Sequence, residues 1–139
     1  MLNLKLVAAA KLALRDGGLP DNVSENNPER IGVMVGTAFG GMETFERETL
    51  KLHKKPERPK VSPFTIPALL GNTASGVIAI ETGCKGPNYG VTSACASGSH
   101  AIGEAMGMIQ EGWSDMMVSI VTSIIFDFWI LGSKLFKKN

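Results

Sequence analysis

GPNYGVTSACASGSH, residues 86–100, is the stretch that decides the fold of this chain. Its first half predicts a short strand from Tyr89 to Thr92, and its second half begins a predicted helix over residues 94–112. Cys95 lies where the two meet. A thiol at the start of a helix is close to unpaired N–H groups and to the positive end of the helix dipole, and both favour the thiolate that attacks acyl carbonyls. The pattern therefore indicates acyl-transfer chemistry, with Cys95 as the candidate nucleophile.

Helices and strands alternate on both sides of this stretch. Apolar residues at helical spacing predict helices upstream, and short apolar runs predict one buried strand upstream and one downstream. The predicted helices cover residues 1–14, 42–53 and 66–83, and the predicted strands cover residues 31–36 and 116–121. This order predicts an α/β layered fold. The loop GTAFGG, residues 36–41, lacks the Lys-Ser/Thr pair of a phosphate-binding loop. We therefore interpret these glycines as a tight turn.

The composition is that of a soluble globular domain and narrows the classes of function. The chain has 139 residues, of which 44% are apolar and 19% charged, and its net charge is +1. So small a charge argues against nucleic acid as a partner and gives no strong field towards a membrane. Two cysteines make no disulfide framework, which favours a reducing compartment. Neither histidine is near a Cys-x-x-Cys pair, so we expect no metal and no cofactor.

The residues alone leave the role of Cys95 open. A lone cysteine is usually a small buried hydrophobe, and that interpretation fits Cys84 at the end of a predicted helix. A nucleophile also needs a base. His100 lies roughly 140° around the same helix and cannot readily reach the sulfur of Cys95. His53 lies in a charged run, residues 51–60, which indicates either a solvated loop or a contact with an acidic partner such as a carrier protein. Either Cys95 is structural, or the rest of the site is missing from this sequence.

Three glycines occupy the interior of the predicted helix over residues 94–112, at Gly98, Gly103 and Gly107. Each costs about 1 kcal/mol relative to alanine in an exposed helix. We expect close backbone packing to compensate, and the helix to lie in the middle of a larger protein.

The stretch from Gly86 to Gly98 resembles the active-site signature of the β-ketoacyl-acyl-carrier-protein synthases, the condensing enzymes of fatty acid synthesis. Residues 36–41, 61–67 and 112–118 are similar to the same family and occur in the same order. The resemblance implies a thiolase-like layered fold of two similar halves in a homodimer. This chain would supply most of the N-terminal half only.

The resemblance also implies roles for individual residues. Cys95 would take an acyl chain from a thioester of the acyl carrier protein. Decarboxylation of malonyl-carrier thioester and carbon–carbon bond formation would need two histidines of the second half, which have no counterpart here. Phe39 falls where the family lines its acyl tunnel and would shorten the pocket, although a core residue is the alternative. Thr65 and Leu69 match positions that reach the tunnel of the partner subunit.

The last part of the sequence departs from the family pattern. We interpret residues 1–118 as a partial synthase domain and residues 119–139 as a divergent apolar tail from truncation, frameshift or intron read-through. A membrane anchor over residues 116–131 is less favoured, because the run is shorter than about 20 residues and contains Asp127. We therefore expect a soluble protein, in a plastid or mitochondrion if eukaryotic and in the cytoplasm if bacterial. The alternative function is a non-catalytic thiolase-like fragment that pairs with a full-length subunit.

Overall fold

The computed structural model of the chain describes residues 2–54, 57, 60–122 and 132–137. Within these residues the strands form one sheet in the order β2-β1-β3-β4. Strands β1 (Ile31–Thr37), β2 (Asn88–Val91) and β3 (Met116–Thr122) are parallel, with Ile31 opposite Met116 and Gly36 opposite Val91. Strand β4 (Gly132–Lys137) runs antiparallel to β3. The α/β layered fold predicted from the sequence is confirmed.

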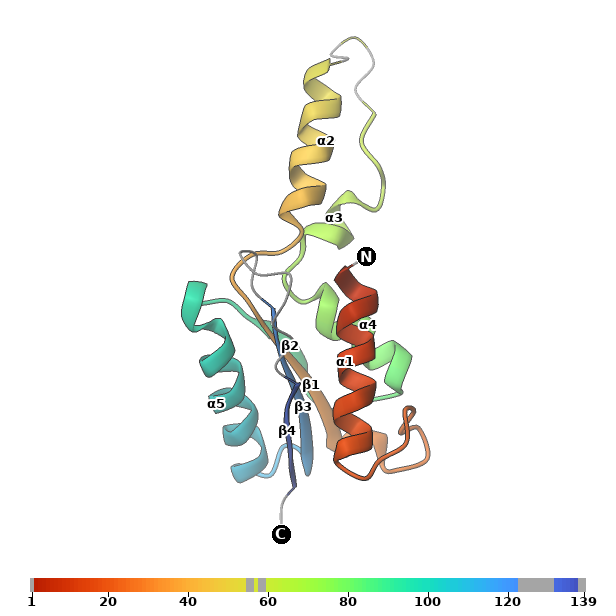
Figure 1. Cartoon of the computed structure of the whole chain (residues 1–139), viewed down its shortest axis with the longest axis vertical. Coiled ribbons are helices and arrows are strands. Elements are labelled where there is room, and N and C mark those ends of the chain that lie inside the picture. Colours follow the sequence, from red (N-terminus) through yellow and green to blue (C-terminus); the bar gives the residue numbers. More distant parts are fainter. Residues whose placement is uncertain (1, 55–56, 58–59, 123–131, 138–139) are drawn as a thin grey trace.

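Helices cover both faces of the sheet (Figure 1). Helices α1 (Leu2–Asp16) and α4 (Thr73–Thr82) pack on one face, and α5 (Ser97–Gln110) packs on the other. Side chains of β1 alternate between them: Val33 and Val35 join the core under α1 and α4, whereas Met34 packs with alanines of α5. Every residue of β1 is buried, which is why the strand is a continuous apolar run in the sequence.

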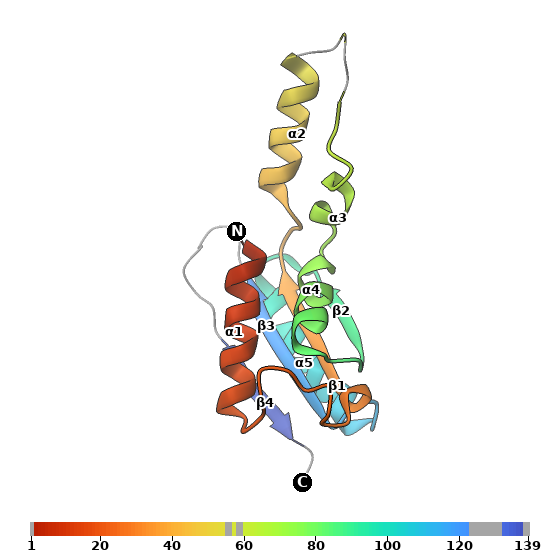
Figure 2. The same cartoon turned by 90° about the vertical axis from the view of Figure 1, so that its right-hand side faces the viewer.

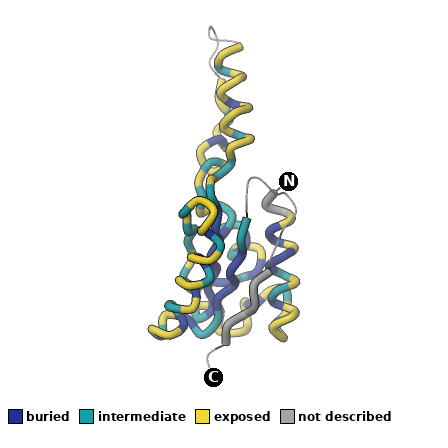
Figure 3. The backbone as a smooth tube through the Cα atoms, turned by 60° about the vertical axis from the view of Figure 1, so that its left-hand side comes forward, coloured by how far each residue is buried: buried dark blue, intermediate teal, exposed yellow. Residues whose placement is uncertain are grey.

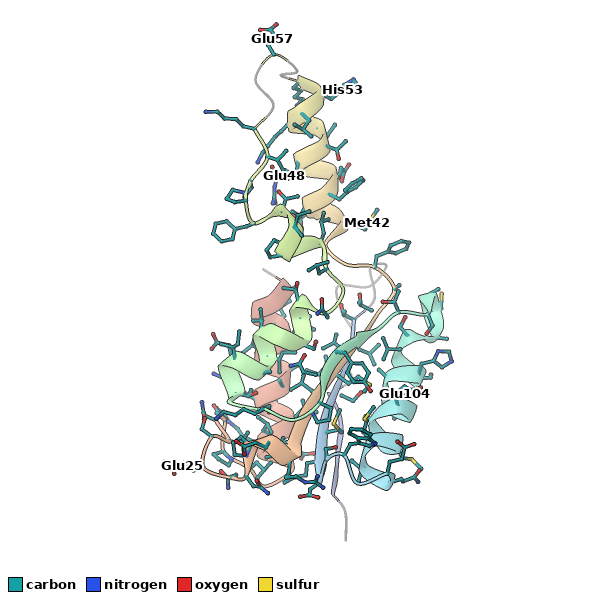
Figure 4. All side chains as sticks on the ribbon, turned by 180° about the vertical axis from the view of Figure 1, so that it is seen from behind. Glu25, Met42, Glu48, His53, Glu57 and Glu104 are labelled. Atoms are coloured by element: carbon teal, nitrogen blue, oxygen red, sulfur yellow. The ribbon has the colours of Figure 1, made fainter. Side chains whose placement is uncertain are left out.

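An arm, residues 39–70, projects from this layered body (Figures 1 and 2). It contains α2 (Met42–Lys54) and the short helix α3 (Thr65–Leu69). The carboxylate of Glu48, buried within α2, accepts hydrogen bonds from Lys51 Nζ at 2.7 Å and from the backbone N–H of Ser62 at 3.2 Å. Glu48 therefore ties α2 to the returning chain. It lies on α2 between Met42 and His53 (Figure 4).

The helix predicted over residues 66–83 is two helices, α3 and α4. Leu70 between them is extended, with ψ 133°. The break brings the chain against β2, because a Cβ added at Gly90 would lie 2.8 Å from the carbonyl oxygen of Gly71. A continuous helix would not make this contact. The end of α4 at Gly83 was predicted correctly, and its φ of 78° is one that glycine adopts without strain.

The predicted close packing of the glycines in α5 is confirmed at one position. A Cβ at Gly98 would lie 2.6 Å from Cγ1 of Val121 at the end of β3. A Cβ at Gly103 or Gly107 would meet nothing within 4 Å. The close contact of α5 with the sheet is therefore at its first turn.

The predicted tail over residues 119–139 is described only in part, because residues 123–131 and 138–139 lie outside the described residues. Strand β3 continues past residue 118 to Thr122, and β4 pairs with it. Among the residues that are described, no helix has the length and apolar character to cross a membrane.

Candidate active site

Cys95 lies at the carboxyl edge of the sheet. Since β1 and β2 are parallel, the residues that follow them meet at one edge, where α/β proteins commonly bind ligands. Four residues after Val91, the last residue of β2, Cys95 occupies a 3₁₀ turn, Ala94–Ala96, that leads directly into α5. Its thiol is exposed. The strand-to-helix position predicted from the sequence is confirmed, with the helix starting at Ser97 instead of residue 94.

The backbone of this turn is held in an unusual conformation. Ala94, directly before the cysteine, has a φ of 49°, in the left-handed region that costs a side chain about 1–2 kcal/mol. Such a conformation persists only where the surroundings fix it.

Ser97 connects this turn to the sheet. Its hydroxyl accepts a hydrogen bond from the N–H of Ser93 at 2.8 Å. The same oxygen lies 2.7 Å from the carbonyl oxygen of Ala94 and 3.1 Å from that of Thr37, the last residue of β1. Ser97 is only 2% exposed. Sequence reasoning missed this residue; the available signal was a hydroxyl two residues after Cys95, in the run of small residues from Ala94 to Ser99.

Neither histidine is bonded to the candidate nucleophile. His100 Nδ1 lies 2.6 Å from Ser93 Oγ, so its hydrogen bond goes to the loop before the turn. His53 lies in the last turn of α2, on the arm (Figure 4). The expectation that His100 does not pair with Cys95 agrees with this geometry.

The second cysteine is a buried core residue, as predicted. Cys84 is 7% exposed and packs in the core beneath α1 and α4. Burial raises the pKa of its thiol, and Thr82 Oγ1 lies 3.2 Å from its sulfur. Cys84 is thus an internal contrast to the exposed Cys95.

The three residues proposed to contact substrate lie at the base of the arm. Phe39 is 60% exposed, so within the described residues it is not a core side chain. The next residue, Gly40, lies tightly against the carbonyl of Leu69, which is half-buried. Thr65 is buried, and its hydroxyl has no hydrogen-bond partner among the residues described.

The base of the arm approaches the Cys95 turn through Gly71. A Cβ there would lie 3.6 Å from Thr92 Oγ1 and 3.7 Å from Thr37 Cγ2. The structure thus brings the segments that carry Phe39 and Leu69 together, through Gly40, and places them beside the strand ends next to Cys95. In the described ranges, no group of three or more His, Cys, Asp or Glu side chains is placed to hold a metal ion.

The arm is largely exposed (Figure 3), and it carries exposed apolar side chains that sequence reasoning did not identify. Eight of the twelve large apolar side chains exposed among the described residues belong to it: Phe39, Met42, Phe45, Leu50, Val61, Phe64, Ile66 and Leu70. Surfaces of this kind commonly mark contacts with other chains or ligands.

Comparison with known sequences finds one family and a consistent set of relatives. Residues 2–130 match the family model described as the N-terminal domain of β-ketoacyl synthase. The chain is 42% identical over 113 residues to 3-oxoacyl-[acyl-carrier-protein] synthase 2 of Staphylococcus aureus, covering 81% of this chain and 27% of that protein. The synthase of the same name from Synechocystis is also 42% identical, with 26% of its length covered. The chain thus spans about a quarter of the length of these relatives.

Solved structures show the same fold. A β-ketoacyl synthase from Burkholderia phymatum superimposes with a TM-score of 0.69 at 26% identity, over 86% of this chain and 29% of that one. A ketosynthase bound to the hexaketide, in complex with its type II PKS acyl-carrier protein, gives a TM-score of 0.73 at 24% identity, over 82% of this chain and 32% of that one. The layered sheet is therefore the N-terminal portion of a thiolase-like fold. The family match runs to residue 130, past the boundary predicted after residue 118, which stays a prediction.

Proposed function

Since the chain belongs to the β-ketoacyl synthase family, we propose that it acts as a β-ketoacyl-acyl-carrier-protein synthase of fatty acid biosynthesis, with Cys95 as the acyl acceptor. The thiolate of Cys95 attacks the carbonyl carbon of an acyl-carrier thioester. The tetrahedral oxyanion collapses, the carrier leaves as a thiolate and takes up a proton, and the acyl group stays on Cys95. The backbone N–H of Cys95 serves as one oxyanion donor, a kind of contact worth about 3–4 kcal/mol in a transition state.

The condensation step is assigned to residues outside the matched portion. A malonyl-carrier thioester loses carbon dioxide, and the resulting enolate attacks the acyl-Cys95 carbonyl. A carbon–carbon bond forms and the thiolate of Cys95 is released. Proton transfer and stabilisation of the enolate need groups such as the two family histidines. The given residues cover 27% of the length of the staphylococcal relative and include the candidate acyl acceptor, so acylation is the step that we propose for these residues themselves.

The observation that carries this proposal is an exposed thiol in a fixed turn between parallel strand and helix. It is tested by incubating the chain with a radiolabelled acyl-carrier thioester, or with the cysteine-directed inhibitor cerulenin, and locating the adduct by mass spectrometry. We expect one adduct, at Cys95. A Cys95→Ala variant should take up no label, and the buried Cys84 should stay unmodified in both proteins.

A protein that is labelled at Cys95 but gives no β-ketoacyl product supports the acylation step. The absence of any adduct at Cys95, with the fold intact by circular dichroism, refutes the proposed activity.

The proposed acyl-binding residues are Phe39, Thr65 and Leu69. The exposure of Phe39, and the close approach of its neighbour Gly40 to the carbonyl of Leu69, support a role at a surface that a ligand or second subunit covers. Phe39→Gly in a full-length parent enzyme should lengthen the accepted acyl chain. An unchanged product length would contradict the role of Phe39.

A non-catalytic fragment that pairs with a full-length subunit is the second candidate function, and the apolar arm favours it. For either function we propose that the arm contacts a second subunit, as in a homodimer. The acyl carrier protein is the proposed partner of the catalytic form. Replacing Phe64 and Ile66, which are 75% and 65% exposed, by serine should reduce the mass measured by light scattering. Leu12→Ser, at a 63% exposed position away from the arm, is the matched control and should leave it unchanged. Assembly without labelling of Cys95 would favour the interaction fragment.

A further inference from the structure

We propose that Ser97 is a positioning residue for Cys95: its buried hydroxyl holds the turn that presents the sulfur and thereby sets the reactivity of the thiol. The proposal rests on the proposed role of Cys95 as the reacting group. Ser97 acts through the backbone on either side of the cysteine, at Ser93 and Ala94, and through the end of β1 at Thr37.

The hydroxyl of Ser97 has a chemistry suited to this position. A serine hydroxyl offers one proton and two lone pairs. One lone pair accepts the N–H of Ser93 at 2.8 Å, and the proton is shared between the carbonyl oxygens of Ala94 at 2.7 Å and Thr37 at 3.1 Å. One atom thus joins the residue two before the cysteine, the residue directly before it and the neighbouring strand. Loss of the hydroxyl leaves the buried carbonyl of Thr37 and the part-buried groups of Ser93 and Ala94 without that partner.

The turn needs such a constraint, because nothing intrinsic to an alanine favours the conformation of Ala94. Its φ of 49° is disfavoured, so the backbone would relax away from it if released. Relaxation would move the sulfur away from the start of α5, where the helix dipole is positive. The contact of Gly98 with Val121 holds the first turn of α5, which carries Ser97, against β3. The position of the Ser97 hydroxyl is therefore set by the sheet and not by the cysteine turn.

His100 is a weaker candidate for the same role. Its bond to Ser93 Oγ is exposed, whereas Ser97 is 2% exposed and bonds to backbone. Exposed hydrogen bonds compete with water and hold geometry less firmly.

The test measures the alkylation rates of the two cysteines in the full chain at neutral pH. Peptide mass spectrometry follows the modification of Cys95 by iodoacetamide, with the buried Cys84 as an internal monitor of the fold. Ser97→Ala is the test variant. Ser99→Ala is the matched control, since Ser99 is an exposed serine in the same helical turn. Ser97→Thr restores the hydroxyl.

We expect Ser97→Ala to slow the alkylation of Cys95 by about threefold or more, a change of the size that one lost hydrogen bond produces. Ser99→Ala should match the wild type, and Ser97→Thr should recover most of the rate. Cys84 should stay protected throughout. A Cys95 rate in Ser97→Ala equal to that of the wild type overturns the proposal. So does a rise in Cys84 labelling together with the change at Cys95, because it would show a general loss of fold.

A second readout separates positioning from general loosening. Iodoacetate carries a negative charge, so the start of α5 should favour it over neutral iodoacetamide only while the sulfur is held there. The rate ratio of the two reagents at Cys95 should fall by about two- to fivefold in Ser97→Ala. An unchanged ratio contradicts positioning. Neither reagent is a thioester, so the alkylation test does not depend on acylation. If acylation failed, the proposed function would be refuted, and the alkylation rates would still decide the role of Ser97.

Discussion

Replacing Gly98 by alanine should destabilise the chain at the first turn of α5. The added methyl carbon would lie 2.6 Å from Cγ1 and 2.9 Å from Cγ2 of Val121, whereas carbon atoms pack at about 3.5–4.0 Å. The helix start must therefore move by roughly 1 Å or Val121 must leave its rotamer, at a cost of about 1–3 kcal/mol. The higher helix propensity of alanine offsets up to about 1 kcal/mol of this. We expect a net loss of about 1–2 kcal/mol, or roughly 5 °C in Tm.

Equilibrium urea denaturation of Gly98→Ala measures this loss, and the same helix provides a matched control. Gly103→Ala introduces the same methyl group where nothing lies within 4 Å, so it should stabilise the chain by about 0.5–1 kcal/mol. In a Val121→Ala background, Gly98→Ala should cost less, because the methyl groups that it meets are gone. If Gly98→Ala proves as stable as Gly103→Ala, the close contact between α5 and β3 does not exist and the placement of the Cys95 turn is wrong.

Three further outcomes follow from local contacts. Ala94→Gly should raise the free energy of unfolding by up to about 1 kcal/mol in a urea titration, since glycine adopts a φ of 49° without strain; a lower value would contradict a left-handed residue there. The pKa of Glu48 is lowered, chiefly by its bond to Lys51 and next by the N–H of Ser62. The ionised Glu48 therefore stabilises the folded chain above the unfolded-state pKa near 4.5, and this stabilisation is lost as the pH falls through the folded-state pKa. Glu48→Gln should therefore weaken the fall in urea midpoint between about pH 5 and about pH 3, and an identical fall would refute the link. Arg30→Lys should speed hydrogen exchange at the Asp115 amide, which donates to the Arg30 carbonyl at 2.8 Å. The reason is that lysine cannot reproduce the paired bonds of the guanidinium to the Asp115 carboxylate. Unchanged exchange would show that those bonds do not hold the start of β3.

The features that the sequence predicts well are those encoded by neighbouring residues. The apolar run over residues 31–36 identifies the central strand, because burial on both faces leaves no polar position in it. Cys95 could be placed at a strand-to-helix junction from its neighbours alone, and Cys84 could be placed in the core. Each depends on local periodicity or on the preference of glycine for helix ends.

The features that the sequence does not predict depend on contacts between distant segments. The break between α3 and α4 brings the chain at Gly71 against Gly90 of β2. A local signal was present, since Gly71 is followed by Asn72 at the N-cap of α4, but the helical pattern around it led to the prediction of one helix. The role of Ser97 depends on Thr37, 60 residues earlier. The projection of the arm could not be predicted either, because the helical pattern over residues 42–53 does not say what α2 packs against.

The order of the strands has a consequence for how the chain is made. Strand β1 is central, yet Ile31 pairs with Met116, so the ribosome must add 85 more residues before that partner emerges. At translation rates of about 5–20 residues per second, the edge of β1 that pairs with β3 stays without its partner for roughly 4–17 s. Chaperones that bind nascent chains should therefore associate with the segment around residues 31–37 during synthesis.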